Sequence, residues 1–374
     1  MVRGVVLVAV LGACSFQPRA AGTGDAARRD GPDRDAPDGG GSGSNAGGAK
    51  RKALTIDKMK VAGSLDDFEL YVELTDADLA AAARADGHDI YFTDAQGVAL
   101  SFERELYAGG HLIAWVHLPH IDNSANLTIY VGYGDLAKAT APDPAGTFPN
   151  YAAVWHMDDA LTSPAVADTT GGHPGTAVML GPTAQVAGKL GGAIAFDGSG
   201  TQRIDFSSPL TGTGQHTISA WVNQQQVNHT SAIVTVGTNA TDQARFVYGA
   251  YGGGGLGAGL YNDDWQPNAD LQGAGWKLVH WTYNGTDKKS HLFVDGTEVT
   301  PMHTFNAAAN TPASTGSIGW APQPSFGADN EMLGQLDEVR IATALRPPAW
   351  CATEFANQSS PGTFYSVGAE QPAP

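Results

Sequence analysis

Short runs in which hydrophobic and polar residues alternate recur along most of the chain after position 50, and each run predicts a β-strand. The clearest example is residues 192–222. Ile194 and Phe196 alternate with alanines before an Asp-Gly turn, and Ile204 and Phe206 alternate with charged residues after it. A period of two indicates a strand with one buried face, because successive side chains point to opposite faces of a sheet. The turn between the two runs predicts that they pair as a hairpin.

The same alternation continues beyond this hairpin. Ile218 and Val222 fall on one face of a third run, whereas Trp221 falls on the other. Hydrophobic residues then alternate on both sides of an Asn-Gly turn at 284–285, and an Asp-Gly pair at 295–296 marks another hairpin. The 48 glycines and 21 prolines agree with an all-β fold that contains many turns.

Residues 50–140 predict a smaller β-sandwich with one helical insert. Thr75 or Asp76 is placed to cap a short alanine-rich helix, which Gly87 ends. A proline-containing linker at 141–150 leads to a second β-sandwich at 151–370. The predicted fold class is therefore all-β, with two β-sandwich domains. Within the first domain, further strands are predicted at residues 90–93, 98–106, 112–118 and 127–133.

Composition argues against nucleic-acid binding, and the position of Cys351 predicts a structural role for it. The chain has 374 residues, and 38 acidic residues against 21 basic ones give a formal charge of −17. Since no basic stripe is present, we expect no nucleic-acid partner. Of the two cysteines, Cys351 lies in a predicted helix and is expected to be a buried small hydrophobic residue.

The first residues resemble a bacterial lipoprotein signal. Residues 1–13 contain one basic residue and an apolar run too short to span a bilayer, and they end in Leu-Gly-Ala before Cys14. This resemblance implies cleavage before Cys14, lipidation of its sulfur and, with Ser15 following, an outer-membrane location. An ordinary signal peptide with an incidental cysteine is the alternative. Residues 14–49 are rich in Gly, Ala, Asp and Pro, and they predict a disordered tether.

Motifs of the second unit occur in the order of one known family. They resemble the laminin-G-like, concanavalin A-like jelly rolls, and the resemblance covers about 200 residues. It implies two packed antiparallel sheets, of which the concave one is commonly used for binding. The motifs are AVWHMDDA, VADTTGGHPGTA, FDG, ISAW, the run WKLVHWTY, VDG, GSIGW and LDEVRI.

The first unit also has a family resemblance. It is similar to a bacterial β-domain family of unknown function, which often precedes laminin-G-like jelly rolls in surface proteins. Some members are fused to proton-channel components of the ExbB and TolQ type. The resemblance brings no catalytic residues with it. Its phrases are ADGHDIYFTDAQG, FERELY, LIAWVHLPHI and NLTIYVGYGD.

Hydrolysis has to be considered because concanavalin A-like folds also include glucanases. Such enzymes place two carboxylates on one face of a strand, so that both reach the same cleft. The alternation of residues 335–339 predicts that Asp337 shares the face of Val339 and Ile341, and that Glu338 points the other way. The expected catalytic pair is therefore missing, and no catalytic residue is predicted.

Calcium is the one cofactor that the sequence suggests. Related jelly rolls often hold a structural calcium bound by carboxylates and carbonyl oxygens. The candidate ligands are Asp168, Asp197 and Asp337. Each of them has a simpler role open to it, because an aspartate can instead accept hydrogen bonds from the backbone of its turn.

A glycine-rich segment at 246–267 carries the residue types that bind sugars. Aromatic faces stack on sugar rings, and amides and carboxylates bind their hydroxyl groups. The alternative is a pair of strands in which aromatic residues restore packing lost at glycines. The candidate ligand-binding residues are Tyr248, Tyr251, Tyr261, Asn262, Asp263 and Trp265.

These features together predict a non-catalytic, lipid-anchored cell-envelope protein. Its jelly roll is expected to bind carbohydrate or a surface protein. One alternative is a structural or adhesion module that binds no glycan, and another is a glycoside hydrolase or lyase. Ligand identity, calcium dependence and oligomeric state are beyond the sequence.

Overall fold

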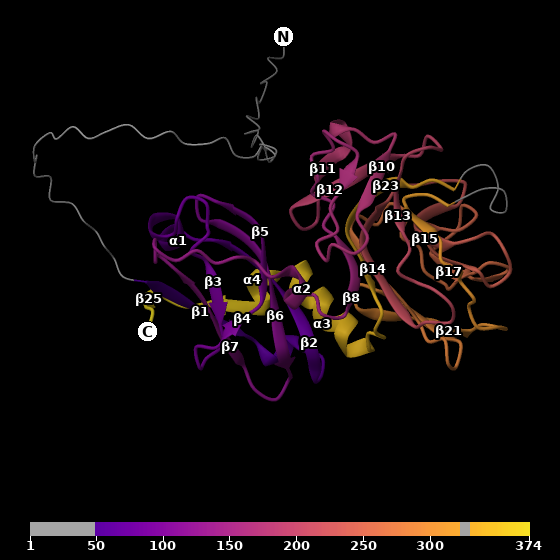
Figure 1. Cartoon of the computed structure of the whole chain (residues 1–374). Coiled ribbons are helices and arrows are strands. Elements are labelled where there is room, and N and C mark those ends of the chain that lie inside the picture. The colour runs from indigo at the N-terminus through magenta and orange to yellow at the C-terminus, as the bar shows by residue number, and fades with distance from the viewer. Residues whose placement is uncertain (1–48, 322–329) are drawn as a thin grey trace, which may run out of the picture. The chain divides into compact units, whose positions relative to one another are not determined.

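Two antiparallel sheets form the first β-sandwich (Figure 1). The larger sheet has the order β24-β1-β7-β3-β4, with β25 also paired to β1, and the smaller has the order β2-β6-β5. The structure is a computed structural model that describes residues 49–321 and 330–374. The predicted signal peptide, Cys14 and the tether up to residue 48 lie outside the described residues. The strands from the first part of the chain are β1 (Lys50–Ile56), β2 (Leu65–Thr75), β3 (Tyr91–Thr93), β4 (Ala99–Leu100), β5 (Phe102–Ala108), β6 (His111–Ile121) and β7 (Leu127–Tyr133).

Alternation and capping explain these elements. Leu54 and Ile56 of β1 and the apolar residues of β2 and β6 fill one core between the sheets. Helix α1 (Ala77–Ala82) begins at the predicted cap, because the Asp76 carboxylate accepts hydrogen bonds from the N–H groups of Asp78 and Leu79. The short helix α2 (Pro144–Thr147) lies in the predicted linker.

The end of the chain returns to the first sandwich, which corrects the predicted boundary at residue 370. Strands β24 (Tyr365–Val367) and β25 (Gln371–Pro372) pair with β1. Trp350 and Phe364 pack in the core of the first sandwich. They belong to α3 (Pro348–Ser359) and α4 (Pro361–Phe364). The sequence could not show which sheet this segment joins, because strand pairing depends on contacts far apart in the sequence.

The second sandwich is a jelly roll of two eight-stranded sheets. One sheet packs its outer face against the first sandwich, and we call it the docked sheet. Its strand order is β11-β12-β23-β14-β19-β20-β21, with β8 also paired to β23. The other, β18-β17-β16-β15-β22-β13-β10-β9, is the distal sheet. The strands of the docked sheet are β8 (Tyr151–Trp155), β11 (Gln185–Ala187), β12 (Gly192–Asp197), β14 (His216–Gln224), β19 (Lys277–Tyr283), β20 (Lys289–Val294), β21 (Thr297–Thr304) and β23 (Leu333–Ala342). Those of the distal sheet are β9 (Ala165–Val166), β10 (Gly175–Val178), β13 (Arg203–Ser207), β15 (Ser231–Gly237), β16 (Ala244–Ala250), β17 (Gly257–Leu260), β18 (Asp263–Trp265) and β22 (Thr315–Ile318).

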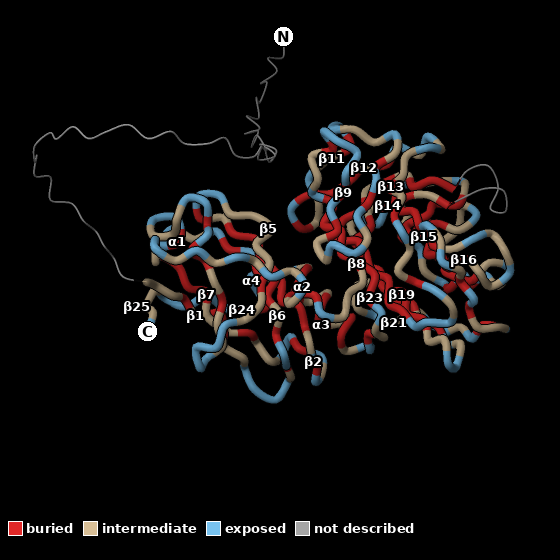
Figure 2. Tube along the Cα trace, in the orientation of Figure 1, coloured by how far each residue is buried: buried red, intermediate tan, exposed pale blue. Residues whose placement is uncertain are grey.

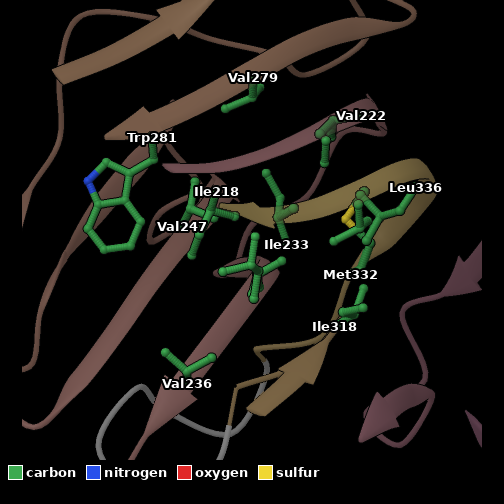
Figure 3. Close-up of a cluster of buried hydrophobic side chains, with 14 of the residues drawn as sticks. Ile218, Val222, Ile233, Val236, Val247, Val279, Trp281, Ile318, Met332 and Leu336 are labelled. Carbon is green, nitrogen blue, oxygen red and sulfur yellow. The ribbon is translucent and has the colours of Figure 1, made fainter. Parts of the chain in front are cut away.

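The core of the jelly roll lies between its two sheets. Figure 3 shows Ile218 and Val222 of β14 meeting Ile233 and Val247 of the distal sheet. In the docked sheet, β14, β19 and β23 are buried along nearly their whole length (Figure 2). Continuous burial means that both faces of these strands are covered: one by the core, the other by α3 and the first sandwich.

Strands β12 and β13 are not the hairpin that their sequence predicts. Strand β12 pairs with β11 and β23 in the docked sheet, whereas β13 pairs with β10 and β22 in the distal sheet. The apolar residues of both strands still face the core, from opposite sides. The Asp-Gly turn therefore carries the chain from one sheet to the other.

Within the described residues, no helix is long and apolar enough to cross a membrane.

Candidate functional site

A β-bulge in β23 sets the chemistry of the docked face. Ser219 pairs with Arg340 and Trp221 pairs with Asp337, so one residue of β14 faces two of β23. The extra residue is Glu338, whose φ of 51° is unusual outside glycine. As a result, Leu336 reaches the core together with Val339 and Ile341, although Leu336 and Val339 are three residues apart.

The bulge overturns one prediction about these carboxylates. Strict alternation placed Asp337 on the core face and Glu338 on the opposite one. In the structure, Asp337 turns to the docked face, where its Oδ2 accepts hydrogen bonds from the N–H groups of Lys189 and Leu190, both at 2.8 Å. Glu338 also faces the first sandwich. The prediction failed because one extra residue in a strand shifts the alternation by one position. Side chains before the bulge then point to the opposite face from the one that strict alternation predicts.

Buried charges join the two sandwiches at this face. His156 Nδ1 lies 2.8 Å from Glu338 Oε1, and its Nε2 lies 3.2 Å from Glu103 Oε2 of the first sandwich. Arg340 donates two hydrogen bonds to Glu338 Oε2, at 2.5 and 3.1 Å. The Arg340 guanidinium also lies 4.0 Å from the ring centroid of Trp115 in β6. His156, Glu338 and Arg340 therefore each have an opposite charge beside them, and Arg340 also has an aromatic face.

Electrostatics in this network follow from burial and neighbours. Burial raises the pKa of Glu105 to about 8, although His156 opposes the shift. Burial likewise raises the pKa of Glu69 to about 7, against the attraction of Arg346 and Arg340. Burial alone would raise the pKa of Glu354, but His280 and Arg340 hold it at about 2.

One group in the described residues has the geometry to hold a metal ion. Ligand atoms of Glu105, His156 and Glu338 all lie within 4.8 Å of one another. Both ring nitrogens of His156 are already at hydrogen-bond distance from carboxylates, and Glu338 also accepts from Arg340. Because these contacts satisfy the three side chains without a cation, we interpret the group as part of the docking network.

The three aspartates predicted as calcium ligands lie in separate places. Among the described residues they do not form a group whose ligand atoms lie within 4.8 Å of one another. Asp168 is buried and accepts from the N–H groups of Val154 and His173 at 2.9 and 2.7 Å. Asp197 is exposed and accepts from Ser199 N at 2.9 Å. Each of the three aspartates thus accepts hydrogen bonds from backbone N–H groups, which is the alternative to calcium binding. Calcium binding stays a prediction.

The distal sheet carries a different kind of site on its outer face. A pocket of about 190 Å³ opens over β13, β15, β16 and β22. Arg203 Nε donates to both oxygens of Asp205 at 3.0 Å, and Ser317 Oγ donates to Asp205 Oδ1 at 2.7 Å. The guanidinium carbon of Arg203 lies 5.0 Å from the ring centroid of Trp320. The pocket thus combines an indole, a guanidinium, a carboxylate and hydroxyl groups.

Two predicted ligand-binding residues lie beside this pocket. Phe246, Tyr248 and Tyr251 stack in a row, with ring centroids 4.7 and 5.7 Å apart. Phe246 lines the pocket, but Tyr248 is fully buried and presents no face to solvent. Tyr251 is half-buried and donates to Asp264 Oδ2 at 2.6 Å.

The other four predicted ligand residues do not join them. Tyr261 and Asn262 form the turn between β17 and β18, and Asp263 accepts a hydrogen bond from the N–H of Asn306 at 2.7 Å. Trp265 is only 7% exposed and belongs to the jelly-roll core, so it offers no platform for a sugar ring. These residues therefore fit the alternative to a sugar-binding site, a pair of strands in which aromatic residues restore packing lost at glycines.

Sequence reasoning missed the residues that form the pocket. Arg203 and Asp205 were visible as polar positions of a strand, which indicated only that they face away from the core. Ser317 and Trp320 come from a segment more than a hundred positions later, and the pairing of β13 with β22 brings them close. The sequence does not show that these two segments are neighbours, because that depends on the order of the strands in the sheet.

Comparison with known families agrees with this architecture. A family model described as the concanavalin A-like lectin/glucanases superfamily (Laminin_G_3) matches residues 197–350. The chain contains a concanavalin A-like domain. A second model, for a domain of unknown function (DUF2341), matches residues 86–164 ahead of it. Both family resemblances seen in the sequence are confirmed, as is the all-β fold class. No curated protein matches the chain.

Several solved structures are similar to part of the chain, at low sequence identity. Domain 4 of an extracellular arabinanase from Geobacillus stearothermophilus, solved with arabinotriose, is 18% identical with a TM-score of 0.42, and the match covers 55% of this chain and 98% of that one. The binding domain of botulinum neurotoxin serotype G is 13% identical with a TM-score of 0.42, over 56% of this chain and 52% of that one. A carbohydrate-binding module of a Ruminococcus gnavus sialidase, bound to sialyllactose, is 15% identical with a TM-score of 0.33, over 38% and 83%. The chain thus spans nearly all of the arabinanase domain and about half of the neurotoxin domain.

Proposed function

We propose that this is a non-catalytic binding protein of the bacterial cell envelope, whose concanavalin A-like domain binds carbohydrate on its distal sheet. The observation that carries the proposal is the pocket in which Trp320 lies beside the Arg203–Asp205 pair. Sugars are amphipathic, since their ring faces are apolar and their edges carry hydroxyl groups. An indole matches the ring face, and fixed charged groups match the hydroxyls.

Local contacts hold this pocket ready for a ligand. The backbone carbonyl of Trp320 accepts a hydrogen bond from Thr235 Oγ1 at 2.8 Å, which fixes the backbone at this residue. Asp205 is oriented from two strands, by Arg203 and by Ser317. Binding then orders few side chains, so little conformational entropy is lost.

The docked face supports a non-catalytic role. Asp337 and Glu338 are the adjacent carboxylates of β23, and they are 0% and 2% exposed beneath the first sandwich. A polysaccharide cannot reach them without separating the two sandwiches. General acid and nucleophilic catalysis both require contact with the scissile bond, so these carboxylates are unsuited to hydrolysis in this arrangement.

Placement at the envelope follows from the first residues of the sequence. The proposed lipid on Cys14 and the tether after it would hold the two sandwiches near a membrane surface, where a glycan or an envelope protein is met. Radioactive palmitate supplied to cells should label the wild-type protein and not Cys14→Ser. Equal labelling of both would contradict the anchor.

A glycan array probed with the full mature chain tests the binding proposal. We expect binding to at least one class of polysaccharide, with affinity reduced at least about tenfold in Trp320→Ala, the loss typical of a central aromatic contact. Trp276→Ala is the matched control, because Trp276 is half-buried but packs beside the docked face. Reducing-end assays on the bound glycan should show no sugar release.

Two results would contradict this proposal. Sugar release by the wild-type protein would favour the hydrolase or lyase alternative. An array with no binding, together with recovery of an envelope protein by crosslinking in cells, would favour a structural or adhesion module.

A further inference from the structure

The first sandwich has a pocket of its own, larger than the one on the distal sheet. It has a volume of about 510 Å³ and opens on the outer face of the sheet that contains β1, β3 and β7. Arg51, Tyr91 and Tyr130 extend from these three strands, and Lys138 comes from the segment after β7. Register places Arg51, Gly132 and Tyr91 side by side across the sheet.

Each tyrosine ring in this pocket holds a cation. The guanidinium of Arg51 lies 4.1 Å from the ring centroid of Tyr130, and Lys138 Nζ lies 3.3 Å from that of Tyr91. Gly132 makes the second contact possible, because a Cβ at this position would collide with the Tyr91 ring. The ring can therefore lie flat against the sheet and turn its other face to the lysine. Cation–π contacts of this kind position a charge without neutralising it.

The two cations share the pocket with Asp143 and with Pro374, the last residue of the sequence. Neither Arg51 nor Lys138 forms a salt bridge with any described residue. Arg51 Nε is also buried with no hydrogen-bond partner. Asp143 lines the pocket but is engaged elsewhere, since it accepts hydrogen bonds from Ser101 Oγ and from Gly146 N at the start of α2.

The two pocket cations differ from the arginine–carboxylate pairs found elsewhere in the protein. Arg340 belongs to such a pair, with Glu338 beside it. Two cations that share one pocket and form no salt bridge with a described residue keep donors open, which is what an anionic group requires.

We propose that this pocket binds a ligand that carries carboxylate groups. The carboxylate would lie between Arg51 and Lys138, and the rest of the ligand would pack on the apolar surface formed by Ala99 and Leu100. Guanidinium and ammonium groups bind carboxylates through charge-assisted hydrogen bonds. The source of the carboxylate is either an acidic sugar or an acidic peptide. This site lies in a different domain from the proposed carbohydrate site, so either can fail alone.

Calorimetric titration of the full mature chain tests the proposal. The probes are digalacturonate, its neutral counterpart digalactose, and triglutamate. We expect at least one of the two acidic probes to bind, digalactose not to bind, and the affinity to fall as salt is raised. Binding by digalacturonate alone would identify an acidic sugar as the source, and binding by triglutamate alone an acidic peptide.

Substitutions then locate the site. Arg51→Gln and Lys138→Gln should each weaken binding of the acidic probe by about tenfold or more, the effect of removing one charged partner. Lys60→Gln should leave it unchanged, because Lys60 is exposed and does not line the pocket. Lys138 lies outside the strands, so its variant keeps the test valid if Arg51→Gln unfolds. Binding that ignores both substitutions, equal binding of digalactose, or no binding of either acidic probe would overturn the proposal.

Discussion

The docked and distal faces of the jelly roll both carry an arginine–carboxylate pair, but the two pairs differ in their access to water. The side chains of Arg340 and Glu338 on the docked face are each 1% exposed, whereas those of Arg203 and Asp205 on the distal face are 26% and 36% exposed. Buried charges are costly unless every one of them is paired, so the docked pair is committed to holding two sandwiches together. The distal pair is partly exposed beside Trp320, as the proposed binding site requires. Residue type alone therefore does not separate a structural charge from a binding one.

Removing the docked arginine should produce the largest effect. Arg340→Ala removes a buried cation that contacts both Glu338 and Glu354, and we expect the unfolding free energy to fall by roughly 3–5 kcal/mol. Urea denaturation of the wild-type and variant proteins measures this. A loss below about 1 kcal/mol, the value of a surface pair, would show that the docked face is hydrated and would remove the contrast with the distal face.

The pH dependence of stability is a second way to compare the buried docked face with the exposed distal face. Burial raises the pKa of Glu69 to about 7 from its ordinary value of 4.5, so the folded protein holds this proton more tightly than the unfolded chain does. Its stabilising contribution is complete below pH 4.5 and is lost as pH rises through 7, with a slope of up to about 1.4 kcal/mol per pH unit. Glu105, whose pKa is raised to about 8, changes stability in the same direction.

Denaturation between pH 5 and 8 measures this dependence. We expect wild-type stability to fall across the range and Glu69→Gln to have a flatter profile, because its amide does not titrate. Asp205→Asn on the distal face is the control and should keep the wild-type slope. If Glu69→Gln and the wild type have parallel profiles, Glu69 is not buried in the way described.

The smallest effect on stability is expected at the distal pair. Arg203→Ala breaks a half-exposed contact with Asp205 and should change the unfolding free energy by less than about 1 kcal/mol. Thermal denaturation beside Arg340→Ala compares the two faces directly. A loss as large as that of Arg340→Ala would mean that the Arg203–Asp205 pair is structural, and the distal pocket would lose its main support.

Much of the fold could be predicted because it depends on local patterns. Alternation placed Ile218 and Val222 in the core and Trp221 on the other face, and Asp76 was recognised as a helix cap. Burial of Cys351 is also confirmed. These features depend on residues close together in sequence, where periodicity and capping chemistry act directly.

The site was harder to predict, because it depends on strand order and on one irregularity. The bulge at Glu338 moved Asp337 to the docked face, and no pattern in the sequence marks it. The pocket residues Arg203 and Trp320 meet only because β13 pairs with β22. Trp265 was misplaced because composition cannot distinguish an aromatic residue that packs against the core from one that faces solvent.

The most direct test of the central claim is the affinity of the distal pocket for a glycan. For a polysaccharide that the array identifies, calorimetric titration would be carried out on the wild type, Trp320→Ala and Trp276→Ala. We expect Trp320→Ala to lose at least about tenfold in affinity while its unfolding midpoint stays close to that of the wild type, and Trp276→Ala to bind normally. Wild-type affinity in Trp320→Ala would contradict the claim.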